Sequence, residues 1–148
     1  GIENAMSKEF YELDETIIKN PEDLDYKRMI EATKEVIKDI SDLGKVLVIS
    51  RGASAILKEK ENVLRVFFSA NEDERISRAK KMHNLESDAV AIDLLKHADH
   101  AQDEYFKKAF NLDFNDQSMY HLTLNTSNLT PEECSSIILN LSKDKLTY

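Results

Sequence analysis

The sequence predicts a single α/β domain with a small, mainly parallel sheet. Three short apolar runs, at 46–49, 63–68 and 120–124, have the composition of buried strands. Longer segments with apolar residues at helical spacing separate these runs, so the strands need crossover connections and pair in parallel. The chain has only 3 glycines and 2 prolines among 148 residues, so we expect no flexible linker.

The overall composition excludes several classes of partner. A formal net charge of -8 argues against binding along nucleic-acid backbones, although a few local arginines could still bind a small phosphorylated ligand. No apolar run approaches the roughly 18 residues of a membrane helix, so we expect no membrane partner. The lone Cys134 cannot form an internal disulfide, which favours a cytoplasmic location.

The first predicted helix begins at Asn20 and Pro21, because asparagine caps helices and proline suits the first helical position. Gly44 gives the expected stop. Residues 1–5 precede Met6 and look like a remnant of a cloning vector, so we expect the domain to cover 6–148. The apolar residues of this helix recur mostly at spacings of three, four and seven: Tyr26, Met29, Ile30, Val36, Ile37 and Ile40.

The first predicted strand, 46–49, leads into the turn Ser50-Arg51-Gly52 and then a short helix over 53–59. The second strand, 63–68, contains one charged residue, Arg65. Asn71 and Glu74 then have the spacing of a capping box at the start of a helix.

A long helix is predicted over 86–110, followed by a polar loop over 111–118 and the third strand. Thr130-Pro131-Glu132-Glu133 is the strongest helix-start signal in the chain. The residues expected to form the buried face of this last helix are Cys134, Ile137, Ile138 and Leu141. Cys134 is therefore interpreted as a core residue rather than a nucleophile.

Open parallel sheets bind ligands beyond the carboxyl ends of their strands. This rule selects the segments 50–52, 69–71 and 125–127. Arg51 is the strongest candidate, because a guanidinium at a rigid strand end, next to Gly52, suits bidentate phosphate recognition. The alternative is a surface arginine paired with a nearby acid.

Two further arginines, Arg75 and Arg78, are three residues apart and therefore share one helical face. They could hold a phosphoryl group. They could equally be solvated residues that offset Glu72 and Glu74, and without other information the spacing favours this second interpretation.

A metal-binding pattern is also present but weak. His97, His100 and Glu104 fall on one side of the long helix, as zinc ligands can, yet a complete site needs a ligand from elsewhere. We expect two half-exposed histidines and no metal.

Several stretches, in order, resemble the cytidylate kinase-like family of nucleoside monophosphate kinases. "VISRGASAIL" is similar to a family strand that ends in Gly-Arg-Gly-Ala, and "NVLRVFFSANEDERISRAKK" to the next strand and the helix that follows it. "HADHAQDEYFKKAFNLDFNDQSMYHLTLNTSNLTPEE" is similar to the lid helix, the final strand and a capped last helix. The resemblance covers about two thirds of the chain.

The resemblance implies a three-layer α/β/α fold of the P-loop kinase type, here in reduced form. It also implies phosphoryl transfer from ATP, with Mg²⁺, to a nucleoside monophosphate. The positions that it assigns are Arg51 and Gly52 on the monophosphate side, Arg75 and Arg78 at the start of the lid region, Asp99, Gln102 and Tyr105 in the lid region, and Asn125 and Thr126 on the adenine side.

Departures from the family pattern point away from catalysis. The phosphate-binding motif G-x-x-x-x-G-K-[ST] does not occur in this sequence. Gln102 stands where the family has a lid arginine, His121 where it has an aspartate, and Ser50 where a glycine is usual. We therefore expect a binding, regulatory or assembly module that has no cofactor of its own and does not transfer phosphoryl groups.

Two alternatives stay open. The chain could be the C-terminal part of an active ATP- and Mg²⁺-dependent nucleoside monophosphate kinase whose phosphate-binding loop lies upstream. Ranked last is a helical metal-binding module. The resemblance also implies that a strand is missing between 46–49 and 63–68, so either these two strands pair directly or something else fills the gap. A second copy, a partner chain or the segment Lys8–Leu13 could complete the sheet, and we expect the protein to form a homo-oligomer or to bind a partner chain there.

Overall fold

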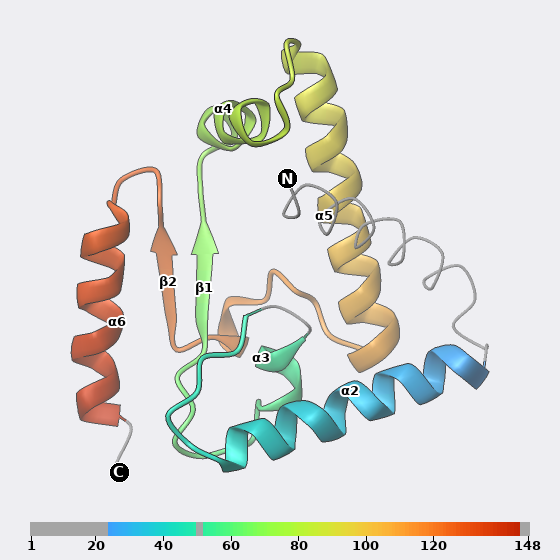
Figure 1. Ribbon diagram of the computed structural model, residues 1–148, viewed down its shortest axis with the longest axis vertical. Helices are drawn as coiled ribbons and strands as arrows, with labels where there is room; N and C mark the ends of the chain where they lie inside the picture. The colour runs from blue at the N-terminus through green and yellow to red at the C-terminus, as the bar shows by residue number, and fades with distance from the viewer. Residues whose placement is uncertain (1–23, 50–51, 146–148) are drawn as a thin grey trace.

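The computed structural model describes residues 24–49 and 52–145 (Figure 1). The predicted start of the first helix, at residues 20–23, and the turn residues Ser50 and Arg51 lie outside the described residues. The elements in chain order are α2 (Leu24–Asp42), α3 (Ala53–Ile56), β1 (Val66–Ser69), α4 (Glu72–His83), α5 (Asp88–Phe110), η1 (Gln117–Met119), β2 (Leu122–Asn125) and α6 (Pro131–Lys145).

The sheet consists of β1 and β2 in parallel, with Val66 opposite Leu122 and Ser69 opposite Asn125. The prediction of an α/β chain with a small parallel sheet is thus confirmed, whereas the three-layer arrangement stays a prediction. Both strands begin later than predicted because polar bonds occupy the residues before them. Arg65 donates from its amide to Nδ1 of His121 at 3.1 Å and from Nε to the carbonyl of Met119 at 2.7 Å.

The first predicted strand is wrong: 46–49 is extended chain without ladder pairing to another described residue. Its side chains are largely exposed, with Val46 at 44%, Leu47 at 85% and Ile49 at 77%. Gly44 and Lys45 both have positive φ, 68° and 55°, and this double turn sets the direction in which the chain leaves α2. A strand needs a neighbour for its backbone groups, and apolar composition alone does not provide one.

The helices bury fewer residues than their apolar patterns predict. In α2, Tyr26, Ile30 and Ile37 are buried, but Val36 is 55% exposed and Ile40 38%. In α6, Cys134 is buried as predicted, whereas Ile137 is exposed. α3 also ends early, at Ile56 rather than residue 59. The long helix matches its prediction closely.

Of the helix caps predicted at α4 and α6, only the second forms. At α6, the amide of Glu133 donates to Oγ1 of Thr130 and the amide of Thr130 donates to Oε2 of Glu133, at 3.2 and 2.7 Å. At α4, Asn71 occupies the capping position but its side chain makes no capping bond. Asn71 Oδ1 instead accepts from Asn125, and Glu74 accepts from Arg78, so other partners have taken both groups.

An aromatic cluster forms the core between β1 and the last turns of α5. Phe67 lies 4.9 Å from Tyr120 and 5.3 Å from Phe114, measured between ring centroids, and Phe106 lies 4.9 Å from Phe114. Phe106 is only 1% exposed. Phe114 belongs to the segment that was predicted to be a polar loop, so this loop contributes directly to the core.

Figure 1 shows how the helices are placed relative to the two strands. α4 lies beyond their carboxyl ends, α3 lies near their amino ends, and α5 runs from one level to the other. Any site at the carboxyl ends is therefore formed by the strand ends, α4 and the first half of α5.

Candidate functional site at the carboxyl ends of the strands

The ends of β1 and β2 are joined by hydrogen bonds around Thr126. Its amide donates to the carbonyl of Ser69 at 2.8 Å, and its hydroxyl donates to the same carbonyl at 3.0 Å. Ser69 and Asn125, the last residues of β1 and β2, lie opposite each other, so the two strands end at the same level. The predicted segments 69–71 and 125–127 are therefore adjacent, as the rule for parallel sheets requires.

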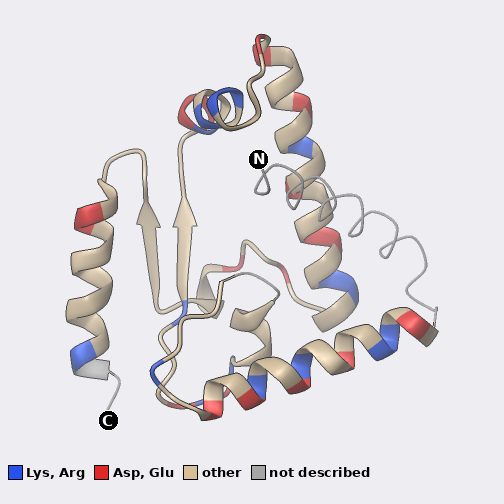
Figure 2. Cartoon of the chain, in the orientation of Figure 1, with Lys and Arg blue, Asp and Glu red and all other residues tan. Residues whose placement is uncertain are grey.

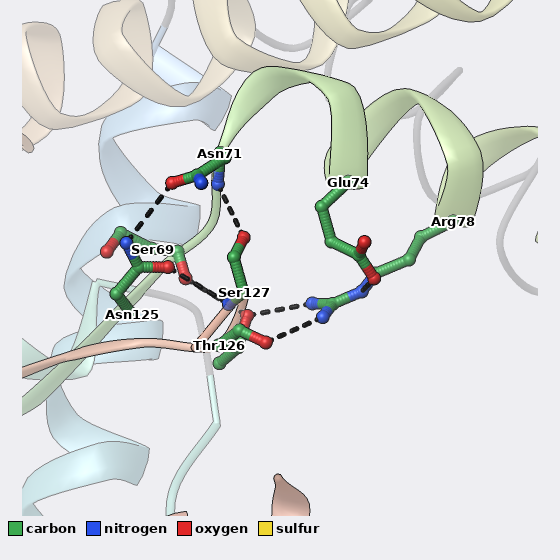
Figure 3. A network of polar contacts seen from close by, with 7 residues as sticks. All are labelled: Ser69, Asn71, Glu74, Arg78, Asn125, Thr126 and Ser127. Carbon is green, nitrogen blue, oxygen red and sulfur yellow. Dashed lines mark hydrogen bonds and ion pairs between the residues drawn. The ribbon is translucent and has the colours of Figure 1, made fainter. Parts of the chain in front are cut away.

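A second set of bonds links the residue before α4 to the turn after β2 (Figure 3). The amide of Asn71 donates to Oγ of Ser127 at 2.8 Å, and Nδ2 of Asn125 donates to Oδ1 of Asn71 at 3.2 Å. Asn125 Oδ1 in turn accepts from the amide of Ser127 at 2.9 Å. Asn125, which was predicted to line a nucleotide site, thus has both polar ends of its side chain bonded within the protein.

Arg78 reaches across from α4 and holds this turn. Its NH1 donates to Oγ1 of Thr126 at 2.7 Å and its NH2 to the carbonyl of Thr126 at 2.8 Å, while Nε donates to Oε1 of Glu74 at 3.0 Å (Figure 3). All three nitrogens of the guanidinium therefore have protein acceptors. The structure brings together Arg78 and Thr126, which the sequence had placed in separate groups.

Arg75 makes a bidentate ion pair with Asp99 on α5. NH1 donates to Oδ2 at 2.9 Å and NH2 to Oδ1 at 2.6 Å. Hydrogen bonding to Asp99 raises the pKa of Arg75, with desolvation opposing the shift. Both side chains are partly exposed, at 37% and 54%. The pair ties α4 to α5 at a position that solvent reaches.

A shallow pocket lies beside this pair, between α4 and α5. Its volume is about 240 Å³, just below the range of roughly 300–1,000 Å³ that is usual for ligand pockets. Its charged lining is balanced, with Arg75 and Lys96 opposed by Glu72 and Asp99. An anionic group in this pocket would have to compete with Asp99 for Arg75.

Comparison with known protein families identifies the family of this chain. The model of the cytidylate kinase-like family matches residues 2–128. This chain belongs to the cytidylate kinase-like family. A search of curated proteins found no match. Among solved structures, the chain is similar to an uncharacterized protein from Eubacterium ventriosum ATCC 27560, with a TM-score of 0.71 and 16% identity over 90% of this chain and 81% of that one.

Gly52, which the resemblance placed on the monophosphate side, lies away from Arg75 and Arg78. Gly52 precedes α3 and has φ 71°, and a Cβ there would lie 2.5 Å from the Phe110 ring and 3.3 Å from Tyr105. Glycine is needed here for backbone conformation and for packing against α5. Arg51, the strongest candidate from sequence, lies outside the described residues.

Asp99, Gln102 and Tyr105, which the resemblance assigned to the lid region, lie on α5 and have different surroundings. Asp99 is bonded to Arg75, and Gln102 is half-buried three residues further along the helix. Tyr105 packs edge-on against Phe110, with ring centroids 5.5 Å apart, next to the aromatic core. Of the three, only Asp99 is bonded to an arginine near the strand ends, Arg75.

The histidines of α5 do not form a metal site with other described residues. His97 Nε2 lies 3.6 Å from Oδ2 of Asp93. Glu104 pairs with Lys108 at 2.7 Å, and this bond lowers the pKa of Glu104. Within residues 24–49 and 52–145, no group of three or more His, Cys, Asp or Glu side chains could hold a metal ion. In the same ranges, no helix has the length and apolar character needed to cross a membrane.

Sequence reasoning missed two features of this site. One is the Arg75–Asp99 pair, because residues 24 apart on different helices carry no local signal of contact. The other is the Asn71–Ser127 bond, which uses a residue that had been assigned to a capping box. The resemblance to the family named Arg75 and Asp99 in separate segments and did not indicate that they meet.

Proposed function

We propose that this chain, although a member of the cytidylate kinase-like family, does not by itself transfer phosphoryl groups and serves as a binding, regulatory or assembly module. The observation that carries this proposal is the state of the two arginines near the strand ends. Arg75 is bonded to Asp99, and Arg78 is bonded to Thr126 and Glu74.

Phosphoryl transfer depends on cations and N–H donors that are positioned for the transferring group, with little covalent work for the protein. Arg78 would have to leave three acceptors before it could contact a phosphate, and the turn after β2 would lose its support. At position 102 the neutral amide of glutamine carries no charge to stabilise the transition state. The absence of the G-x-x-x-x-G-K-[ST] motif supports the same conclusion.

The direct test measures ADP formation with ATP, Mg²⁺ and each of the common nucleoside monophosphates, beside an authentic cytidylate kinase as positive control. We expect no turnover above buffer. The matched variant Gln102→Arg restores a lid cation and should also be inactive. Turnover by the unmodified chain that requires both nucleotides would refute the proposal, and turnover by Gln102→Arg alone would show that the lid residue is what the chain lacks.

The alternative is that the chain is the C-terminal part of an active ATP- and Mg²⁺-dependent kinase. The natural reading frame upstream of residue 6 distinguishes the two functions. If that frame encodes a phosphate-binding loop and the longer protein phosphorylates CMP, the alternative holds. If the longer protein is also inactive, the module function holds. The cytoplasmic location proposed from the lone cysteine is compatible with either function.

For the binding function, we propose a nucleoside monophosphate or another small phosphorylated compound as ligand. Support comes from the partly exposed Arg75–Asp99 pair at the small pocket, where Asp99 competes with any added anion. Calorimetric titration with CMP should show weak binding. Asp99→Asn should strengthen it, because Arg75 loses its ionic partner, and Arg75→Gln should abolish it. Equal affinities in all three proteins would place the ligand elsewhere.

A further inference from the structure

One edge of β1 has no strand paired with it among the described residues. β1 pairs only with β2, and the carbonyls of Arg65 and Ser69 accept from the amides of Leu122 and Thr126 on that side. Successive residues of a strand direct their backbone groups to opposite edges. Val66 and Phe68 therefore direct their N–H and C=O groups away from β2, where an added strand could pair with them.

β1 and the stretch 46–49 both expose apolar side chains. Phe68 itself is 53% exposed, and the extended stretch 46–49 exposes Val46, Leu47 and Ile49. Lys60 bonds to Asp42 at the end of α2, and Arg65 donates to the carbonyl of Lys58 at 2.9 Å, so the segment that enters β1 is tied to the end of α2. An exposed apolar group of this kind next to an open strand edge is typical of an interaction surface.

The two ends of β1 carry opposite charges. Arg65 immediately precedes the strand, and Lys58 and Lys60 lie in the segment before it. After the strand, α4 begins with Glu72, Asp73 and Glu74. Figure 2 shows blue residues near the amino end of β1 and red residues at the start of α4. A partner strand with the same charges fits only in the antiparallel direction, because parallel pairing would place like charges together.

We propose that two copies of this chain pair through the open edges of β1 in the antiparallel direction, about a two-fold axis near Phe67. Val66 of one copy then lies opposite Phe68 of the other, and each pair exchanges N–H···O=C bonds in a continuous sheet of order β2–β1–β1–β2. The amino end of each β1 lies next to the acidic start of the other copy's α4. This inference rests on the assembly role proposed above and assigns it a surface and a partner.

Sedimentation equilibrium of the full chain over a range of protein concentrations tests the pairing. We expect a monomer–dimer equilibrium that shifts toward monomer as salt rises, since the charged ends are screened. Phe68→Lys should give a monomer, because lysine at a strand edge opposes pairing. Thr123→Lys, an exposed position on β2 whose backbone faces away from β1, is the matched control and should remain dimeric. A monomeric wild type, or loss of the dimer in Thr123→Lys with its retention in Phe68→Lys, would overturn the proposal.

Cysteine cross-linking tests the register and does not depend on how well Phe68→Lys folds. In a Cys134→Ser background, chains with Val66→Cys and chains with Phe68→Cys are oxidised separately and as a mixture. Antiparallel pairing predicts cross-linked dimers mainly in the mixture, whereas cross-links mainly within the separate samples, or none at all, would overturn it. A monomer without turnover would refute this inference alone, and a dimer with turnover would refute only the proposed lack of catalysis.

Discussion

The two sides of β1 differ in almost every physical respect. On the β2 side, the strand pairs in register, and the polar groups beyond its end bond to one another. On the other side, Phe68 is exposed and Val66 has no partner strand among the described residues. The carboxyl end of β1 is therefore closed by the protein's own hydrogen bonds, and the edge is the surface that we propose for a partner.

The greatest loss of stability is expected in the aromatic cluster beside β1. Phe106→Ala should lower the free energy of unfolding by about 3–5 kcal/mol, because Phe106 is 1% exposed and central to the aromatic cluster. Phe68→Ala is the matched control. At low protein concentration it should cost less than about 1 kcal/mol, since the side chain is mostly exposed. Urea unfolding measures both variants. Equal losses of stability would show that Phe68 is packed as tightly as Phe106.

Gly52→Ala should lower the free energy of unfolding by roughly 2–4 kcal/mol, the next largest loss, because Gly52 packs against α5. The added methyl would meet the Phe110 ring at 2.5 Å, and φ 71° is costly for any residue with a Cβ. Gly44→Ala shares the positive φ, 68°, but its Cβ would meet nothing within 4 Å, so only about 1–2 kcal/mol is expected. If urea unfolding gave the same loss for both, the contact with α5 would not contribute.

These two glycines also show what the sequence could and could not predict. Gly44 ends a helix, which is a local signal, and the sequence assigned it correctly. Gly52 was assigned to a phosphate-binding turn, but it packs against a ring that is distant in sequence. Local signals likewise predicted the bounds of α5 and the Thr130–Glu133 cap, whereas the failed strand at 46–49 depended on a neighbour that no local pattern reveals.

Arg78→Ala should lower stability by about 1 kcal/mol, a modest value because the side chain is exposed. The change removes two donors from the turn after β2, and the hydroxyl and carbonyl of Thr126 become open to solvent. Arg78→Lys keeps the charge but not the fork of donors, so it should recover only part of the loss. Full recovery by lysine would mean that charge, not hydrogen-bond geometry, holds the strand end closed.

The smallest effect concerns the start of α6. Hydrogen bonds from Thr130, chiefly from its backbone amide, lower the pKa of Glu133 below its usual value. Because the folded-state pKa is lowered, the ionised carboxylate stabilises the fold above its unfolded pKa of about 4.3. This contribution is lost as pH falls through the folded-state value. The difference in Tm between wild type and Glu133→Gln should therefore be small at neutral pH and vanish in acid, and a difference that grew in acid would contradict the assignment.

Residue-resolved amide hydrogen exchange along β1 distinguishes its paired side from its open side. At low protein concentration, the amides of Phe67 and Ser69, which face β2, should be protected, while those of Val66 and Phe68 exchange rapidly. As the concentration rises and copies pair, the Val66 and Phe68 amides should become protected as well. Strong protection of Val66 and Phe68 at low concentration, equal to that of Phe67 and Ser69, would show that the edge is already occupied and would contradict the account.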